Sequence, residues 1–210
     1  MIQKLLSRGG QVIGITGNIC SGKSFALKYF SKRGFKTISI DSVVHKAMQE
    51  NNYIKKKISK AFPEALKNGN ICRVSLDNIV FNDKLMMRKL ESIIHPYTHS
   101  KIKNLSETTR YYRTRSIVIE SPLLFERNRE KYFDYIICLF SSPKTMLKRA
   151  LLRKNMNKKK FYAILNNQTT LKDKIHKANY LICNENKFHV FQSLNKIIIH
   201  DRFKRSCPRY

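Results

Sequence analysis

A short loop motif constrains the fold of this chain more than any other feature of its sequence. The segment 17–24 reads G-N-I-C-S-G-K-S and satisfies the pattern G-x-x-x-x-G-K-[S/T]; it follows an apolar, β-branched segment at 11–16 and precedes helically spaced apolar residues at 24–33. In such a loop, backbone N–H groups surround a nucleotide phosphate, and the positive N-terminus of the next helix attracts the same charge. We therefore predict a nucleotide site formed by Gly17, Asn18, Ile19, Cys20, Ser21, Gly22, Lys23, Ser24 and Phe25.

Two side chains of this motif have defined chemistry. Lys23 is expected to reach the β- and γ-phosphates, and the hydroxyl of Ser24 is expected to coordinate Mg²⁺. The motif alone does not separate kinases, GTPases and ATPases. The chain lacks an N-K-x-D signature for guanine, which weakens the GTPase interpretation. Other residues must therefore decide the activity.

The hydropathy pattern alternates between strands and helices. Strands are predicted at 11–16, 36–40, 116–119, 135–140 and 180–183, and helices at 24–33, 144–155, near 161–168 and at 188–200. This alternation predicts the α/β fold class, with a parallel five-stranded sheet and helices on both faces. Between 42 and 115 the pattern is helical and amphipathic, with breaks expected at Pro63, Gly69 and Pro96, which indicates a helical insertion beside the sheet.

The charge and composition of the chain limit the kinds of molecule that it is expected to bind. The 210 residues include 42 Lys and Arg against 14 Asp and Glu, a formal net charge of +28 that attracts polyanions of any kind. The basic residues are spread through the chain without interleaved aromatics, so we do not expect a nucleic-acid partner. No apolar run approaches the roughly 20 residues of a membrane span, and residues 1–10 are too short and polar for a signal peptide. We expect a cytoplasmic protein without a membrane partner, and its five dispersed cysteines argue against disulfides or a zinc site.

Several further motifs follow the loop in a fixed order. At this point the chain resembles the dephospho-CoA kinases, the last enzymes of coenzyme A biosynthesis. The resemblance covers about 12–184 and is most specific in the unchanged P-L-L-F-E. Its elements are T-G-N-I-C-S-G-K-S (16–24), I-D-S-V-V-H (40–45), F-N-D (81–83), L-E-S-I-I-H-P (90–96), P-L-L-F-E (122–126), and then Arg149, Arg153, Gln168, Ala178 and Asn184.

The resemblance implies a reaction and a domain plan. It implies transfer of the γ-phosphoryl group from Mg·ATP to the 3′-hydroxyl of the ribose of dephospho-CoA, giving coenzyme A and ADP. It also implies one domain over 1–210, with a core at 11–41, 115–144 and 173–200, an acceptor-binding helical insertion at 42–114 and a lid at 145–172. We expect a monomer or a weak homo-oligomer. The alternatives are a small-molecule P-loop kinase for a nucleoside or nucleotide, and a basic nucleic-acid-binding P-loop protein.

The resemblance also implies roles for single residues, each beside a plainer structural reading. Asp41 would be the catalytic base, or else cap a helix, with Lys23 and Arg149 as the other catalytic residues. His45 would orient Asp41 or simply pack. Arg149 and Arg153 would close over the triphosphate from one helical face, or belong to a solvated basic face. The acceptor pocket would include Thr16, Asp41, His45, His95, Leu123, Leu124 and Arg153, and the metal would bind Ser24 and, through water, Glu120.

Five positions depart from the family pattern, among them Asn186, which stands where a glycine is frequent after the last strand. Ser39 and Glu120 stand where aspartates are usual, and Asn18 and Cys20 replace glycines of the loop. If a loop position requires a positive φ, asparagine costs little and cysteine costs more. Because Cys20 adjoins a helix N-terminus and Lys23, its thiol pKa is expected to be lowered, which predicts sensitivity to oxidation.

Overall fold

The computed structural model describes residues 10–112, 116–154 and 156–199, so the predictions for 1–9, 115, 155 and 200 lie outside it. Within these ranges a five-stranded sheet has the order β2-β5-β1-β6-β7, and every neighbouring pair is parallel. The sheet confirms the predicted fold class. Its strands are β1 (Val12–Gly17), β2 (Lys36–Ser39), β5 (Ile117–Glu120), β6 (Tyr135–Phe140) and β7 (Tyr180–Cys183).

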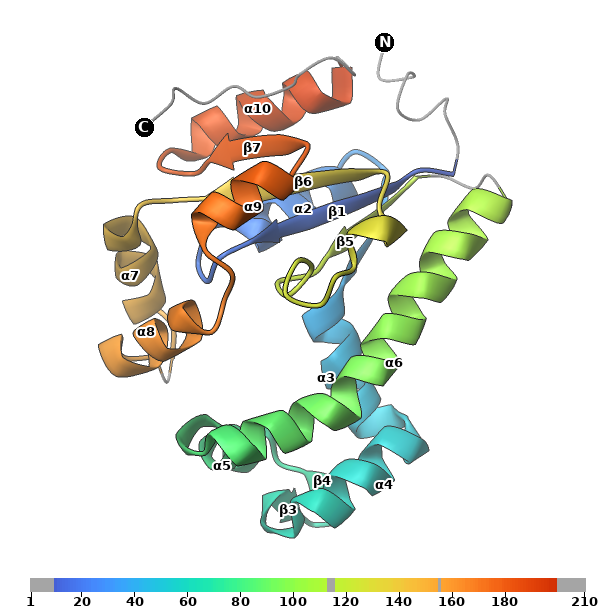
Figure 1. Ribbon diagram of the computed structural model, residues 1–210, viewed down its shortest axis with the longest axis vertical. Helices are drawn as coiled ribbons and strands as arrows, with labels where there is room; N and C mark the ends of the chain where they lie inside the picture. The colour runs from blue at the N-terminus through green and yellow to red at the C-terminus, as the bar shows by residue number, and fades with distance from the viewer. Residues whose placement is uncertain (1–9, 113–115, 155, 200–210) are drawn as a thin grey trace. The chain divides into compact units, whose positions relative to one another are not determined.

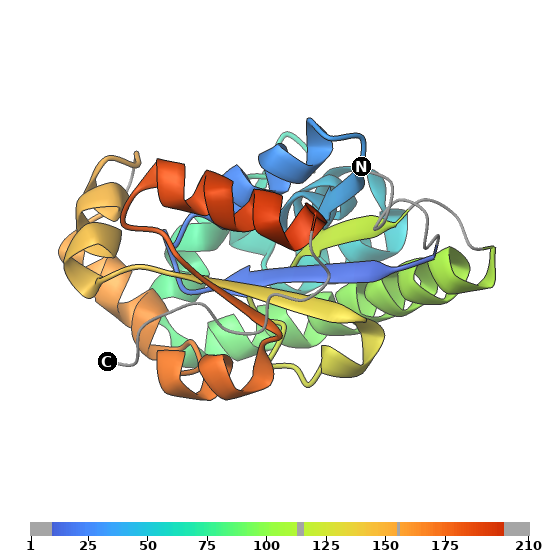
Figure 2. The ribbon, with the colours of Figure 1, turned by 90° about the horizontal axis from the view of Figure 1, so that it is seen from above.

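Helices cover both faces of this sheet. The helices α2 (Lys23–Ser31) and α10 (Lys187–Ile199) lie on one face and α9 (Leu171–Lys177) on the other (Figure 2). The core between the sheet and the helices α2 and α10 contains Ile13, Ile15, Phe30, Leu139 and Leu194, all at most 1% exposed. The strand β1 is buried along its whole length in the middle of the sheet, and its last residue, Gly17, which begins the loop, is paired with Leu139 of β6.

The carboxyl ends of the strands gather polar residues at one edge. Ile15 in β1 is in register with Glu120 at the end of β5, and Glu120 is in register with Ser39 at the end of β2. Ser141 follows β6 and Asn184 follows β7. The helices α7 (Pro143–Leu151) and α8 (Lys158–Asn166), which come after β6, pack against each other (Figure 1). Ligands of open α/β sheets bind at this edge.

Residues 40–104 form a second compact unit, and the other described residues form the first. The second unit has its own apolar core, which includes Ile54, Ile58, Phe62, Ala65 and Leu76. Its elements are α3 (Ile40–Glu50), α4 (Asn52–Ala61), the 3-10 helix η1 (Pro63–Ala65), β3 (Leu66–Lys67), β4 (Asn70–Ile71), α5 (Arg73–Asn82) and most of α6 (Lys84–Tyr111). The segment predicted as helical, with breaks but without strands, therefore contains a hairpin.

Two of the predicted helix breaks are corrected by the structure: Gly69 lies in the turn of a hairpin, and Pro96 lies within a helix. Asn68 and Gly69 have φ of 50° and 71° between the paired strands, the conformation that an Asn-Gly turn favours, so this dipeptide was the missed signal. Pro96 does not end a helix but lies inside α6. A helix-interior proline costs about 3 kcal/mol. The packing of Ile93, Ile94 and Tyr97 against the unit's core offsets that cost.

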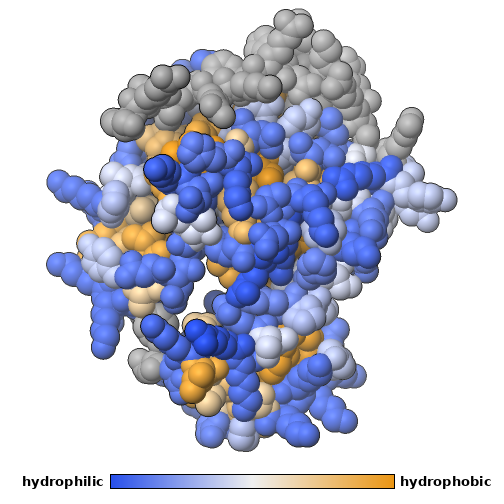
Figure 3. Space-filling model, viewed as in Figure 1, coloured by the Kyte–Doolittle hydropathy of each residue, from blue (hydrophilic) through white to orange (hydrophobic). Residues whose placement is uncertain are grey.

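The helix α9 was also missed from the sequence. Its N-cap is Thr170, whose hydroxyl accepts the N–H of Asp173, while the Asp173 carboxylate bonds back to that hydroxyl. A Thr-x-x-acid pattern of this kind marks a helix start. None of the helices in the described ranges is long and apolar enough to cross a membrane, and the face seen in Figure 3 is mostly hydrophilic.

Candidate active site

The loop Gly17–Ser24, here called the phosphate loop, has a backbone that only small residues permit at two points. Gly17 and Gly22 have φ of +141° and +98°. A Cβ on Gly17 would lie 2.1 Å from the carbonyl oxygen of Leu139, and one on Gly22 would lie 1.9 Å from Nδ2 of Asn184. Both glycines are therefore required by close approach as well as by conformation.

The side-chain nitrogen of Lys23 lies against the backbone of the phosphate loop. Its ammonium donates to the carbonyl oxygens of Gly17 at 3.0 Å and Asn18 at 2.9 Å, and the residue is 8% exposed. The N-terminus of α2 begins at the same residue, so a fixed cation and a helix dipole meet at one place. An anionic phosphate group would be stabilised there.

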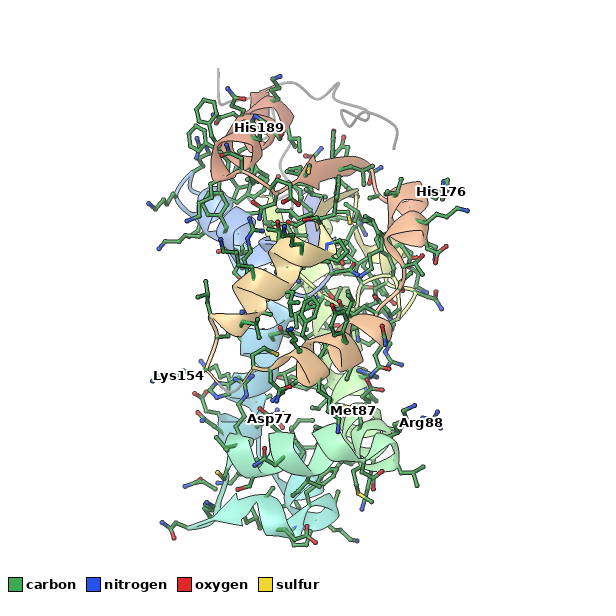
Figure 4. The ribbon with its side chains drawn as sticks, turned by 90° about the vertical axis from the view of Figure 1, so that its left-hand side faces the viewer. Asp77, Met87, Arg88, Lys154, His176 and His189 are labelled. Carbon is green, nitrogen blue, oxygen red and sulfur yellow. The ribbon has the colours of Figure 1, made fainter. Side chains whose placement is uncertain are left out.

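A cavity of about 330 Å³ opens beside the phosphate loop. Four of its lining residues are cationic and none is acidic, a composition that suits a polyanionic phosphate chain. Figure 4 views α7 from the side, with Lys154 just beyond its end. The lining residues are Cys20, Gly22, Lys23, Ser24, Phe25, Arg149, Arg153, Asn184 and Lys187.

The guanidinium of Arg149 is anchored by the sheet rather than carried freely on a helix. Its Nη1 donates to Oγ of Ser141 at 3.0 Å, and its Nη2 donates to the carbonyl oxygen of Asn184 at 2.7 Å. Ser141 also donates to that carbonyl at 2.8 Å. Arg153, one turn further, is exposed. The predicted pair thus shares the cavity, with one fixed and one solvated member.

Ser24 and Glu120 lie together as the metal prediction requires. Oγ of Ser24 donates to Oε1 of Glu120 at 3.4 Å. Glu120 is 5% exposed and Ser24 lies in the first turn of α2. A hydroxyl beside a carboxylate supplies the oxygen ligands, directly or through water, that Mg²⁺ prefers. These residues therefore fit the ion. Glu120, although longer than the aspartate usual in the family, lies within hydrogen-bond distance of Ser24.

Cys20 behaves differently from the expectation. Among the non-glycine residues of the loop, Cys20 has a positive φ, 58°, whereas Asn18 does not. Cys20 is 6% exposed and packs with Met146, Ala150 and Phe161. This burial raises the pKa of its thiol and outweighs the opposing effect of Arg153, Lys23 and Arg149. The prediction of a lowered pKa is therefore wrong, because the helix terminus does not compensate for removal from water.

The P-L-L-F-E segment is divided between core and edge. Leu124 and Phe125 are buried, and Leu124 reaches the backbone of Gly14. Leu123 is half-buried. The hydroxyl of Thr16 donates to the carbonyl oxygen of Pro122 at 3.5 Å, and its side chain is fully buried, outside the cavity described above. Acceptor contacts by Thr16, Leu123 and Leu124 remain predictions.

The remaining predicted acceptor residues belong to the second unit. Asp41 and His45 lie one turn apart on α3, and both are exposed. Asp41 follows β2 after a single intervening residue, as expected for the carboxyl end of that strand. His95 lies within α6, half-buried, and not at a helix end. Their roles remain predictions.

Two cavity residues were absent from the predicted site. The sequence places Asn184 only in the family's order of motifs, whereas in the structure its Nδ2 donates to the carbonyl oxygen of Ser21 at 2.8 Å. Lys187 starts α10 beside the cavity. The position of Asn184 directly after an apolar strand could have identified it, because strand ends form the binding edge.

Known proteins resemble this chain over most of its length. A family model described as dephospho-CoA kinase matches residues 11–189. Dephospho-CoA kinase from Bartonella quintana (strain Toulouse) is 34% identical over 172 residues, covering 82% of this chain and 88% of that protein. Dephospho-CoA kinase from Campylobacter jejuni has a TM-score of 0.66 at 29% identity, covering 90% and 96% of the two chains. Shikimate kinase from Acinetobacter baumannii, in complex with shikimate, shares the fold at a TM-score of 0.57 and 13% identity, covering 97% and 100%.

Proposed function

The chain belongs to the dephospho-CoA kinase family, and on that premise we propose how its residues divide the phosphoryl transfer between them. The protein is an enzyme that phosphorylates dephospho-CoA to give coenzyme A. The observation that carries our assignment of residues is the cavity beside the phosphate loop, with its cationic lining. ATP is the nucleotide that we propose for it.

The phosphate loop and Arg149 bind and orient the triphosphate. Backbone N–H groups of the loop and the ammonium of Lys23 hold the β- and γ-phosphates, in keeping with the position of that ammonium over the loop. The guanidinium of Arg149 stabilises the charge that spreads over the transferring group. Its bonds to Ser141 and Asn184 hold it in place before ATP arrives, so little reorganisation is needed during transfer.

Ser24 and Glu120 are the residues that we propose for Mg²⁺. Ser24 would ligate the ion directly, and Glu120 would bind one of its water ligands. When bound, the ion neutralises negative charge on the β- and γ-phosphates. The hydrogen bond between the two side chains supports this assignment.

Asp41 is our candidate for the general base. It would accept the proton of the ribose 3′-hydroxyl as that oxygen attacks the γ-phosphorus in line. Two features support the assignment: its exposed carboxylate, and its place two residues after the last residue of β2. His45, one turn later, would orient it. Residues 145–172 would act as the lid that limits hydrolysis of ATP by water.

A coupled assay of ADP release tests the assignment. ADP release with Mg·ATP should require dephospho-CoA, and Asp41→Asn should lower kcat by about 10²-fold or more, since an amide cannot take the proton. The matched control is Glu50→Gln, an exposed acid on the same helix, which should retain full activity. Equal activity of the two variants would remove Asp41 from the mechanism.

The setting of the reaction is part of the proposal. We propose a cytoplasmic enzyme that is monomeric or weakly associated and has no nucleic-acid partner. The four described cysteines are free thiols, which suits a reducing compartment. Binding of RNA that weakens steeply with salt and competes with ATP would argue for the nucleic-acid alternative.

A further inference from the structure

The phosphate loop is bonded to a side chain from far along the sequence. The backbone N–H of Ile19 donates to Oε1 of Gln168 at 2.8 Å. Gln168 is half-buried and lies just after the end of α8, where its own N–H donates to the carbonyl oxygen of Leu165 at 3.1 Å. The third residue of the loop is therefore held by the segment between α8 and α9.

The residue after Gln168 is fastened just as directly. The N–H of Thr169 donates to Oε1 of Glu126 at 2.8 Å. The same oxygen lies 3.0 Å from Nζ of Lys174, a lysine of α9 that is fully buried. Adjacent residues thus bond the phosphate loop on one side and the end of the P-L-L-F-E segment on the other.

The loop needs such support because part of it is strained. Cys20, next to Ile19, has a left-handed φ of 58°, a conformation that is costly for a residue with a Cβ. Apolar packing of Ile19 and Cys20 against α7 and α8 holds their side chains. It does not fix the direction of the backbone N–H groups, and the bond from Ile19 to Gln168 does.

We propose that Gln168 is a positioning residue for the nucleotide: it fixes the backbone of the phosphate loop relative to the segment that Glu126 anchors. It does not touch the reacting atoms. Its effect is to keep the loop in its binding conformation before ATP arrives, which lowers the cost of binding. The inference rests on the proposed ATP site at this loop.

The substitution Gln168→Met tests this role. Methionine keeps the length of the side chain but has no oxygen to accept the N–H of Ile19. Because ground-state binding and the transition state lose the same interaction, the Kd and KM for ATP should rise about five- to tenfold, with kcat within about twofold. The KM for dephospho-CoA should not change. Asn167→Ala, at the exposed neighbouring position, is the matched control and should leave all these values unchanged.

Amide hydrogen exchange reads out the bond itself. Exchange at Ile19 should accelerate in Gln168→Met and stay slow in Gln168→Glu, which retains an oxygen at the same distance along the side chain. A merely structural role would lower the melting temperature or the active fraction but leave the affinity for ATP at its wild-type value. That result, or unchanged exchange at Ile19 in the methionine variant, would overturn the proposal.

The proposed ATP site and the role of Gln168 can fail separately. Titration calorimetry of the wild-type protein with Mg·ATP, without acceptor, tests the site alone. Absence of binding there would count against the nucleotide assignment. Binding of equal strength by wild type and Gln168→Met would remove only the role of Gln168.

Discussion

The buried ion pair between Glu126 and Lys174 should be worth far more to stability than the exposed pairs of the same region. Substituting Glu126→Gln keeps the acceptor for the N–H of Thr169 but leaves the ammonium of Lys174, which is 0% exposed, without its counter-charge. Breaking a buried pair on one side costs about 3–5 kcal/mol. At about 2–4 °C per kcal/mol for a chain of this size, Tm should fall by about 6–20 °C.

Urea unfolding at neutral pH measures this cost, and a double variant isolates the interaction. Removing both charges, with Glu126→Gln and Lys174→Met together, should recover most of the lost stability because no buried charge is left. The matched control is Lys177→Met, on the same helix. Lys177 pairs with Glu130 at 3.2 Å but is 46% exposed, so its loss should cost less than about 1 kcal/mol.

The pH dependence gives a second test of the same pair. Burial alone would raise the pKa of Glu126, but the charge of Lys174 and the N–H of Thr169 lower it below the ordinary value of 4.5. A carboxyl group whose pKa is lower in the folded state than in the unfolded state stabilises the fold fully at pH values above the unfolded pKa. This stabilisation is lost as the pH falls through the folded pKa. The difference between wild type and Glu126→Gln should therefore be constant from pH 8 to about 5.5 and shrink below about 4.5. The reasoning would be refuted if Glu126→Gln lost no more free energy of unfolding than Lys177→Met. It would also be refuted if the double variant lost as much as Glu126→Gln and Lys174→Met lose separately, added together.

Three further predictions concern the site. Gly22→Ala should weaken ATP binding by about tenfold or more in calorimetry, because its Cβ meets a buried side chain, whereas Gly34→Ala, with φ of +79° but open space around it, should not. Arg149→Lys should lower kcat by about 10³-fold in the ADP-release assay, since an ammonium cannot reproduce the fork of bonds that fixes the guanidinium. Iodoacetamide at pH 7.5 should label the buried thiol of Cys20 more slowly than the half-buried Cys72, as read by mass spectrometry; faster labelling of Cys20 would contradict the raised pKa.

The sheet could be predicted from the sequence because its strands are short apolar runs between turns. The predicted strands at 135–140 and 180–183 coincide with β6 and β7. Predictions failed where tertiary packing overrides a local rule, as at Pro96, whose helix continues because partly buried neighbours pack against the core of the second unit. The hairpin at Asn68 and Gly69 failed for another reason: its turn signal was present but was read only as a helix break.

The site was predictable where its chemistry is local in sequence. The phosphate loop is one continuous motif, so its residues could be named without a structure. The hydrogen bonds that hold Arg149 could not be predicted from the sequence, because their acceptors, Ser141 and Asn184, follow the ends of different strands. The bond from Gln168 to Ile19 likewise joins residues whose proximity depends on the whole sheet and the helices after it. No local pattern encodes such contacts.

The central position of β1 has a consequence for the order in which the chain can fold during synthesis. Val12 pairs with Ile117 and Ile13 with Tyr135, so β1 has no partner strand until those residues have left the ribosome. At about 5–20 residues per second, that wait lasts roughly 5–20 s. The core of residues 40–104 lies wholly between Ala47 and Tyr97, so this unit can close while β1 still waits. An apolar strand left unpaired for that time is prone to aggregation. The yield of folded enzyme should therefore depend on slow translation, low temperature or a chaperone that covers β1.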